Sequence, residues 1–177
     1  MPALRKQMIC FLMIFFFIHP SIAQSKEEMI KSVRTEFQAI NSDTTLKKVM
    51  LENEDFLGTM TDAGSLLTGF YKDRKIRKIV QWVGLSNGIE VREYYFKDGK
   101  VIFVYAEFKS FPYDEKLGGL NYMKTEITFE GRYYFNNDKL FDSVVAGASE
   151  LASENDGAAR ILLNEAYDDL RLLKKKK

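Results

Sequence analysis

The first periodic segment of the chain has the pattern of an amphipathic helix. Between Met29 and Ile40, apolar residues recur three and four positions apart, which places them on one stripe of a helix of about four turns. Ser25 and Glu28 have the spacing of a capping box, in which side chain and backbone satisfy each other at a helix start. The turn-forming residues 41–43 then end the segment.

From Leu46 onward the period becomes that of β-strands. Asn87-Gly88 and Asp98-Gly99 predict two-residue hairpin turns, because these residue types tolerate positive φ. Residues 101–108 are apolar at almost every position, which predicts an interior strand covered on both sides. The strands predicted from this pattern are 46–52, 65–71, 75–84, 89–97, 100–109, 121–130, 132–135 and 139–145.

A second amphipathic helix closes the chain. Its apolar face runs from Ala159 to Leu173, and residues 153–157 are expected to supply the preceding turn and cap. The order of helix, hairpins and helix predicts one α+β domain. We expect a curved antiparallel β-meander of about six to eight strands with the helices, including the C-terminal amphipathic helix, packed on one face.

The N-terminal segment from Met1 to Ala23 has the three zones of a cleavable signal peptide. Arg5 and Lys6 precede an apolar run at 8–18, and small residues follow at the expected cleavage point. The run is shorter than the ~20 residues that span a bilayer. The alternative is a buried helix of a cytosolic protein. We expect an exported protein, periplasmic or extracellular, whose single domain is residues 24–177.

Removal of the signal changes the chemistry that is available to the chain. Cys10 and His19 are its only cysteine and histidine. Without them, residues 24–177 cannot form a disulfide, a histidine-assisted nucleophile or an ordinary zinc site. Neither a G-x-G-x-x-G motif nor a P-loop is present, and no cofactor is expected. The 24 basic and 25 acidic residues that remain leave no field that would attract nucleic acid.

Three predicted hairpin tips share a sequence pattern. Residues 70–76, 95–101 and 134–140 each contain two aromatics, a polar turn and an aliphatic residue, and resemble the hairpins of MORN-like repeats. Their spacing of 25 and 39 residues is unequal, so shared turn chemistry is the alternative explanation. Segments 67–73, 93–105 and 129–135 resemble a family of exported proteins of unknown function from Bacteroidetes-type bacteria. That resemblance implies export and the meander, and it implies no activity.

The strongest candidate binding residues are aromatic. The long connection at 111–122 contains Phe111, Tyr113 and Tyr122 beside acidic residues and two glycines, and loops on a rigid sheet often carry recognition. Trp82 and the paired tyrosines of the strands can form an aromatic strip on an open sheet face. The alternatives are that the loop folds back over the core and that the strand aromatics are buried in cross-strand ladders.

Acidic and basic clusters give two further candidates. The acidic residues Glu52, Glu54, Asp55 and Asp62 could hold a calcium ion, or could form an exposed acidic loop without a ligand. The four lysines from Lys174 to Lys177 complement the helix dipole and could contact an anionic membrane surface, or form a solvated tail.

These features favour a non-enzymatic exported binding module that recognises a protein, glycan or small ligand through the open sheet face and the 111–122 loop. A carboxylate-dependent hydrolase is the enzymatic alternative, and requires a cleft with two acids, one having a raised pKa. A structural or chaperone-like partner subunit is the third. The sequence leaves the ligand, the oligomeric state and the strand order open.

Overall fold

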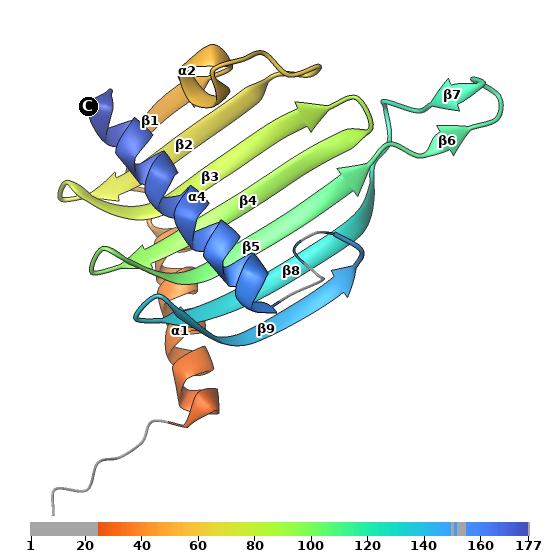
Figure 1. The fold of residues 1–177 in the computed structure, drawn as a ribbon. Helices are drawn as coiled ribbons and strands as arrows, with labels where there is room; N and C mark the ends of the chain where they lie inside the picture. Colours follow the sequence, from red (N-terminus) through yellow and green to blue (C-terminus); the bar gives the residue numbers. More distant parts are fainter. Residues whose placement is uncertain (1–24, 150, 152–154, 177) are drawn as a thin grey trace, which may run out of the picture.

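The computed structural model describes residues 25–149, 151 and 155–176, so the expected export signal lies outside the described residues. The chain forms a helix, a run of antiparallel strands and a second long helix (Figure 1). Its elements are α1 (Lys26–Ser42), β1 (Lys47–Glu52), α2 (Glu54–Leu57), β2 (Ser65–Lys72), β3 (Lys75–Leu85), β4 (Gly88–Lys97), β5 (Lys100–Ser110), β6 (Tyr113–Asp114), β7 (Gly119–Leu120), β8 (Glu126–Asn136), β9 (Lys139–Gly147) and α4 (Asn155–Lys175).

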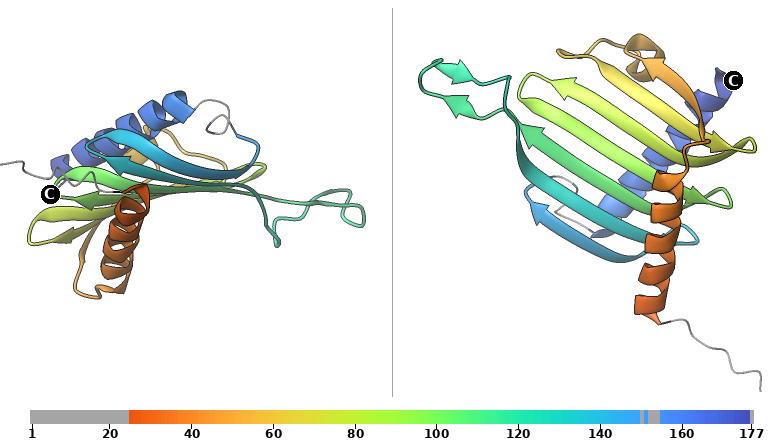
Figure 2. Two further views of the ribbon diagram at one scale, coloured as in Figure 1. Left: turned by 90° about the horizontal axis from the view of Figure 1, so that it is seen from below. Right: turned by 180° about the vertical axis from the view of Figure 1, so that it is seen from behind.

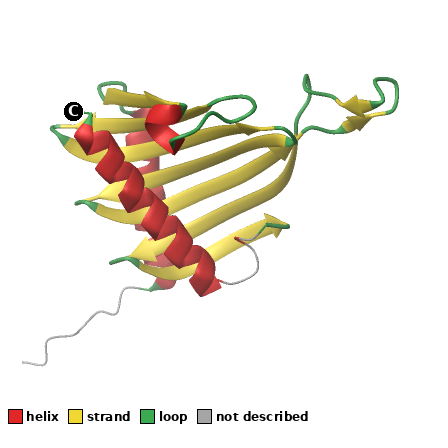
Figure 3. Ribbon diagram, turned by 45° about the horizontal axis from the view of Figure 1, so that its top comes forward, coloured by secondary structure: helices red, strands yellow, loops and turns green. Residues whose placement is uncertain are grey.

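Seven of the strands form one antiparallel sheet in the order β1-β2-β3-β4-β5-β8-β9. Each strand pairs with its neighbour in the sequence, except that β5 pairs with β8 across the small β6–β7 hairpin. That hairpin extends beyond the end of the sheet as a separate arm (Figures 1 and 3). The predicted α+β meander between two helices is therefore confirmed.

The two long helices lie on opposite faces of the sheet (Figure 2). Helix α4 buries Leu162 and Leu173 in the core on one side, and α1 buries Val33 and Ile40 in a separate core on the other. The expectation that both helices pack on one face is wrong for α1. The physical reason is that successive strand residues point to opposite sides, so strands that are apolar at most positions leave two faces to cover.

The paired tyrosines of the strands fill both cores. Tyr94 and Tyr133 pack under α4, whereas Tyr95 and Tyr134 pack under α1, and all four are at most 5% exposed. Of the two fates considered for these aromatics, burial is the one observed. Strand β5 is interior, as predicted, because Val104 lies in the core under α4 and Phe103 in the core under α1.

Three hairpin tips share one backbone geometry. In each tip both central residues have positive φ, which is the type I′ pattern that matches the twist of the strands. The prediction for Asp98-Gly99 is confirmed, with φ of 50° and 79°. The other two tips have the central pairs Asp73-Arg74 and Asn137-Asp138.

The prediction for Asn87-Gly88 is wrong by one position. Leu85 pairs with Gly88, so the turn residues are Ser86 and Asn87, and Gly88 begins β4. Glycine is required at this position by space, because a Cβ on Gly88 would lie 2.4 Å from the carbonyl oxygen of Lys109.

Strand β8 replaces two predicted strands. Residues 121–125 lie outside it, and the backbone continues extended through Gly131, where the prediction separated two strands. The ring of Tyr133 lies over Gly131, 2.6 Å from where a Cβ would be, so the aromatic side chain occupies the space above the glycine. An aromatic two positions along the same face thus lets a glycine stay in the strand.

The first residues of α1 agree with the sequence-based prediction, whereas those of α4 do not. The capping box at α1 is confirmed: Glu28 N–H donates to Ser25 Oγ, and Ser25 N–H donates to Glu28 Oε2, each at 3.2 Å. Helix α4 includes residues 155–157, which were expected to form its turn and cap, so that expectation is wrong there. Residues 152–154 lie outside the described residues.

Candidate functional site

An open cleft of about 380 Å³ lies between α1 and the sheet. Helix α1 forms one wall, and the strands β5, β8 and β9 form the floor and the other wall. A volume in this range is that of a small-molecule site. The lining residues are Val33, Arg34, Phe37, Phe103, Arg132, Tyr134 and Val144.

The floor of this cleft, the α1 cleft, is aromatic and fixed in place. The rings of Phe103 and Tyr134 lie 5.0 Å apart, and the ring of Phe37 meets Phe103 edge-on at 5.5 Å. Such tilted and edge-to-face pairs are the favoured arrangement of aromatic rings. Val144 on β9 is 54% exposed and leaves an apolar wall open to solvent.

Two arginines give the α1 cleft its charge. Arg132 donates to Glu130 at 2.5 Å, and its guanidinium lies 5.8 Å from the ring centre of Tyr105. Arg34 is exposed and makes no ion pair with any described residue. The arrangement can hold an apolar body against the rings and an anionic group against Arg34.

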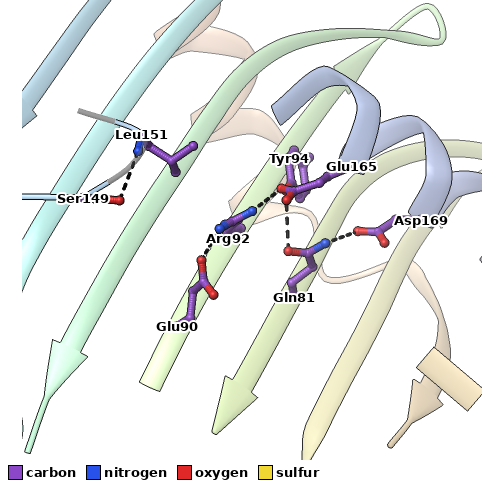
Figure 4. A network of polar contacts seen from close by, with 8 residues as sticks. All are labelled: Gln81, Glu90, Arg92, Tyr94, Ser149, Leu151, Glu165 and Asp169. Atoms are coloured by element: carbon purple, nitrogen blue, oxygen red, sulfur yellow. Dashed lines mark hydrogen bonds and ion pairs between the residues drawn. The ribbon is translucent and has the colours of Figure 1, made fainter. Parts of the chain in front are cut away.

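A buried polar network lies on the opposite face, beneath α4 (Figure 4). Arg92 on β4 forms ion pairs with Glu165 of α4 and with Glu90. Tyr94 donates its hydroxyl to Glu165 Oε2 at 2.8 Å, and Gln81 donates its amide to Asp169 Oδ2 at 2.6 Å. These bonds tie α4 to β3 and β4.

Burial perturbs the titration of this network. Desolvation raises the pKa of Asp169 to about 7, and the charge of Glu165 acts in the same direction. Desolvation and Glu165 also raise the pKa of Tyr94, so its hydroxyl remains a donor. Burial opposes the charge of Arg92, but the hydrogen bond and the charge of Glu165 outweigh this and raise its pKa.

The network therefore contains two nearby acids with one raised pKa, as the hydrolase hypothesis requires. However, Asp169 is only 4% exposed, and its carboxylate is held by Gln81. A cavity of about 230 Å³ beside the network is lined by Glu90 and Arg92 but by neither Glu165 nor Asp169. In the described part of the chain, the two carboxyl groups of Glu165 and Asp169 join the helix to the sheet and do not line that cavity.

The 111–122 connection forms the projecting arm that contains β6 and β7 (Figure 3). Phe111 and Tyr122 meet edge-on at its base, with ring centres 5.1 Å apart. Tyr113 is 67% exposed and Tyr122 65% exposed, so the alternative that these rings cap the core does not hold for them. Leu117 and Met123 are also exposed.

Hydrogen bonds within the arm give it a defined shape. Asn121, which is buried, donates its amide to Asp114 Oδ2 at 3.0 Å, and its backbone N–H donates to the carbonyl oxygen of Pro112 at 2.8 Å. The other carboxylate oxygen of Asp114 accepts from the backbone of Lys116. The arm thus holds a fixed conformation while presenting apolar side chains to solvent.

Trp82 lies apart from both the arm and the α1 cleft. It sits on β3 between Leu66 of β2 and Val91 of β4, on the face of the sheet that carries α1. Helix α1 crosses that face near the tips at 72–75, 97–100 and 136–139 and leaves the other end of the strands uncovered by a helix (Figure 2). Trp82 lies toward that other end of β3. All three side chains are half-buried. An open sheet face with an apolar row is therefore present.

The acidic residues Glu52, Glu54, Asp55 and Asp62 do not assemble into a site. Asp55 forms an ion pair with Lys176. Within the described residues, no three acidic, histidine or cysteine side chains are grouped so that they could hold a metal ion. No helix among those residues has the length and apolar character needed to cross a membrane.

Comparison of the chain with protein-family models, with curated proteins and with solved structures finds no match. Sequence reasoning missed the α1 cleft. The sequence feature that could have indicated this cleft is the pair Arg132 and Tyr134, which are two positions apart and therefore lie on one face of β8.

Proposed function

We propose that this protein is a non-enzymatic exported binding module whose ligand site is the α1 cleft. The ligand class is an amphipathic molecule with an apolar body and one anionic group. The observation that carries the proposal is the combination of an open, aromatic-floored cleft with an arginine that has no acidic partner among the described residues. The uncovered face around Trp82 lies on the same side of the sheet and can extend the contact surface.

Both parts of the cleft favour binding. Apolar surface removed from water against Phe103 and Tyr134 contributes about 25 cal/mol per Å². A hydrogen bond to the charged Arg34 contributes roughly 1.5–3 kcal/mol. Because the ring contacts exist without a ligand, little ordering is needed when one binds.

Isothermal titration with decanoate and decanol tests this proposal. We expect decanoate to bind more tightly than decanol, and Arg34→Gln to weaken decanoate by about tenfold while leaving decanol unchanged. Val144→Trp should weaken both ligands by filling the cleft. The control is Arg160→Gln, which removes another exposed arginine from α4 on the opposite face. Equal binding of the two ligands, or equal loss in both arginine variants, would contradict the proposal.

The arm supports a second candidate, the assembly of two copies of the chain. Its fixed conformation presents Tyr113, Leu117 and Tyr122 to solvent, and Met123, which directly follows the arm, is 93% exposed. Sedimentation equilibrium should show a dimer that Leu117→Asp dissociates, whereas Lys116→Asp, which also introduces an acid into the arm, should leave it intact. A monomer at all accessible concentrations would remove this candidate.

A further inference from the structure

One end of the molecule carries a net positive charge. The tips of three hairpins and the end of α4 all lie at this end of the sheet (Figures 1 and 2). Across the tips 72–75, 97–100 and 136–139 and the helix end 174–176, nine side chains are basic and three are acidic, a net charge of +6. We call this surface the basic end.

Neighbouring acids neutralise only part of the basic end. Three of its lysines form ion pairs with acids of adjacent elements: Lys72 with Asp43, Lys97 with Glu36 and Lys176 with Asp55. With these three acids counted, the net charge is still +3.

Five of the cations at the basic end make no ion pair with any described residue. They come from two hairpin tips and the helix end, and are Arg74, Lys75, Lys139, Lys174 and Lys175.

Three of these cations border a groove of about 430 Å³ between α4 and two of the hairpin tips. Arg74, Lys75 and Lys174 lie along it, together with one acid, Asp98. The rest of its lining is backbone of the turn and the apolar side chains Tyr71, Ile76 and Leu170. The groove thus gathers positive charge over an apolar base.

The backbone at Arg74 gives a second, independent observation. Arg74 has φ of +65°, a conformation that is unfavourable for a residue with a Cβ. The equivalent position in the next hairpin tip is Gly99, at φ of +79°. In the third tip this position is Asp138, at φ of +60°, whose carboxylate accepts a hydrogen bond from the hydroxyl of Tyr167 and pairs with Lys100. Arg74 makes no ion pair with any described residue, so the arginine is better explained by what its side chain does in solvent.

We propose that the basic end docks on a bilayer that contains anionic phospholipid. Cations from four separate elements lie side by side at this end, which suits an extended negatively charged surface better than one small anion. Each lysine or arginine near such a surface strengthens binding about fivefold, and salt screens the attraction. The contact is independent of the α1 cleft.

Co-sedimentation with vesicles tests the proposal. The protein should bind vesicles of phosphatidylcholine mixed with phosphatidylglycerol at about 0.1 M salt, and should be released at about 1 M salt, where the Debye length falls to ~3 Å. Lys75→Gln with Lys174→Gln should lower binding by about 25-fold. The matched control, Lys116→Gln on the arm with Lys124→Gln just after it, should bind like the wild type. No preference for the anionic vesicles, or equal loss in both double variants, would overturn the proposal.

A substitution at Arg74 separates loss of membrane binding from loss of folding. Arg74→Gly should raise the melting temperature by about 2–4 °C, because it relieves the backbone, and yet lower vesicle binding about fivefold. Arg74→Lys keeps both the charge and the unfavourable backbone, so its binding should stay near that of the wild type. A glycine variant that binds anionic vesicles as well as the wild type would refute the role of this tip.

Discussion

The buried carboxyl group of Asp169 should make the stability of the protein depend on pH in an unusual direction. Most folded-state carboxyls have lowered pKa values, and their proteins lose stability in acid. Burial instead raises the pKa of Asp169 from 3.8 to about 7. The substitution that tests this is Asp169→Asn, which keeps the size of the side chain and an oxygen that can accept from Gln81.

The sign and size of the effect follow from these two pKa values. Between pH 3.8 and about 7, Asp169 is protonated in the folded chain and ionised in the unfolded chain. The unfolded state then binds fewer protons, so the free energy of unfolding falls as the pH rises through this window and is constant above it. The difference between the pKa values corresponds to about 4 kcal/mol at pH 8.

Urea unfolding at a series of pH values measures this directly, with the fluorescence of Trp82, the only tryptophan, as the signal. Asp169→Asn should match the wild type near pH 4 and exceed its stability by up to about 4 kcal/mol at pH 8. The neighbouring Asp168 is 58% exposed in its side chain, so Asp168→Asn should change stability by less than about 1 kcal/mol and keep the pH slope of the wild type. If Asp169→Asn retains the wild-type pH slope, the reasoning fails.

Two further predictions concern packing and pairing. Gly88→Ala should destabilise the protein by about 1–3 kcal/mol, because its Cβ would meet the backbone of β5, whereas Gly119→Ala, which has nothing within 4 Å, should be close to neutral in thermal unfolding. Glu165→Gln should lower the free energy of unfolding by at least about 2 kcal/mol, since it leaves Arg92 buried with only Glu90 as a partner. A double-mutant cycle checks the pairing: Arg92→Met combined with Glu165→Met should lower the free energy of unfolding by less than the sum of the two single losses. Additive losses would mean that the pair is not coupled.

The elements were largely predictable because their signals are local. The Ser25 capping box and the Asp98-Gly99 turn depend on residues within a few positions of each other, and both are confirmed. The errors at Gly88 and Gly131 have one cause. The sequence indicates where a glycine occurs but not why it is needed there. A glycine can be required by a positive φ, by a neighbouring backbone or by an overlying ring, and only the fold distinguishes these causes.

The placement of α1 and the α1 cleft could not be predicted in the same way. A period of two residues shows that Tyr94 and Tyr95 point to opposite faces, but it does not say which helix covers each face. The cleft depends on where α1 crosses the sheet, which brings Arg34 beside strands that follow it by about 70 to 110 positions.

The extent of the two helices determines which surfaces remain for binding. The strands are apolar on both faces, and each helix covers only part of one face. Beneath α4 the polar groups around Arg92 pair with one another, and the cavity beside them, of about 230 Å³, is smaller than the α1 cleft. On the α1 side the helix crosses near the hairpin tips, and the uncovered surface beside it contains the α1 cleft and Trp82. Binding on the sheet is therefore expected on the face that α1 only partly covers, while the arm and the basic end extend from the two ends of the same sheet.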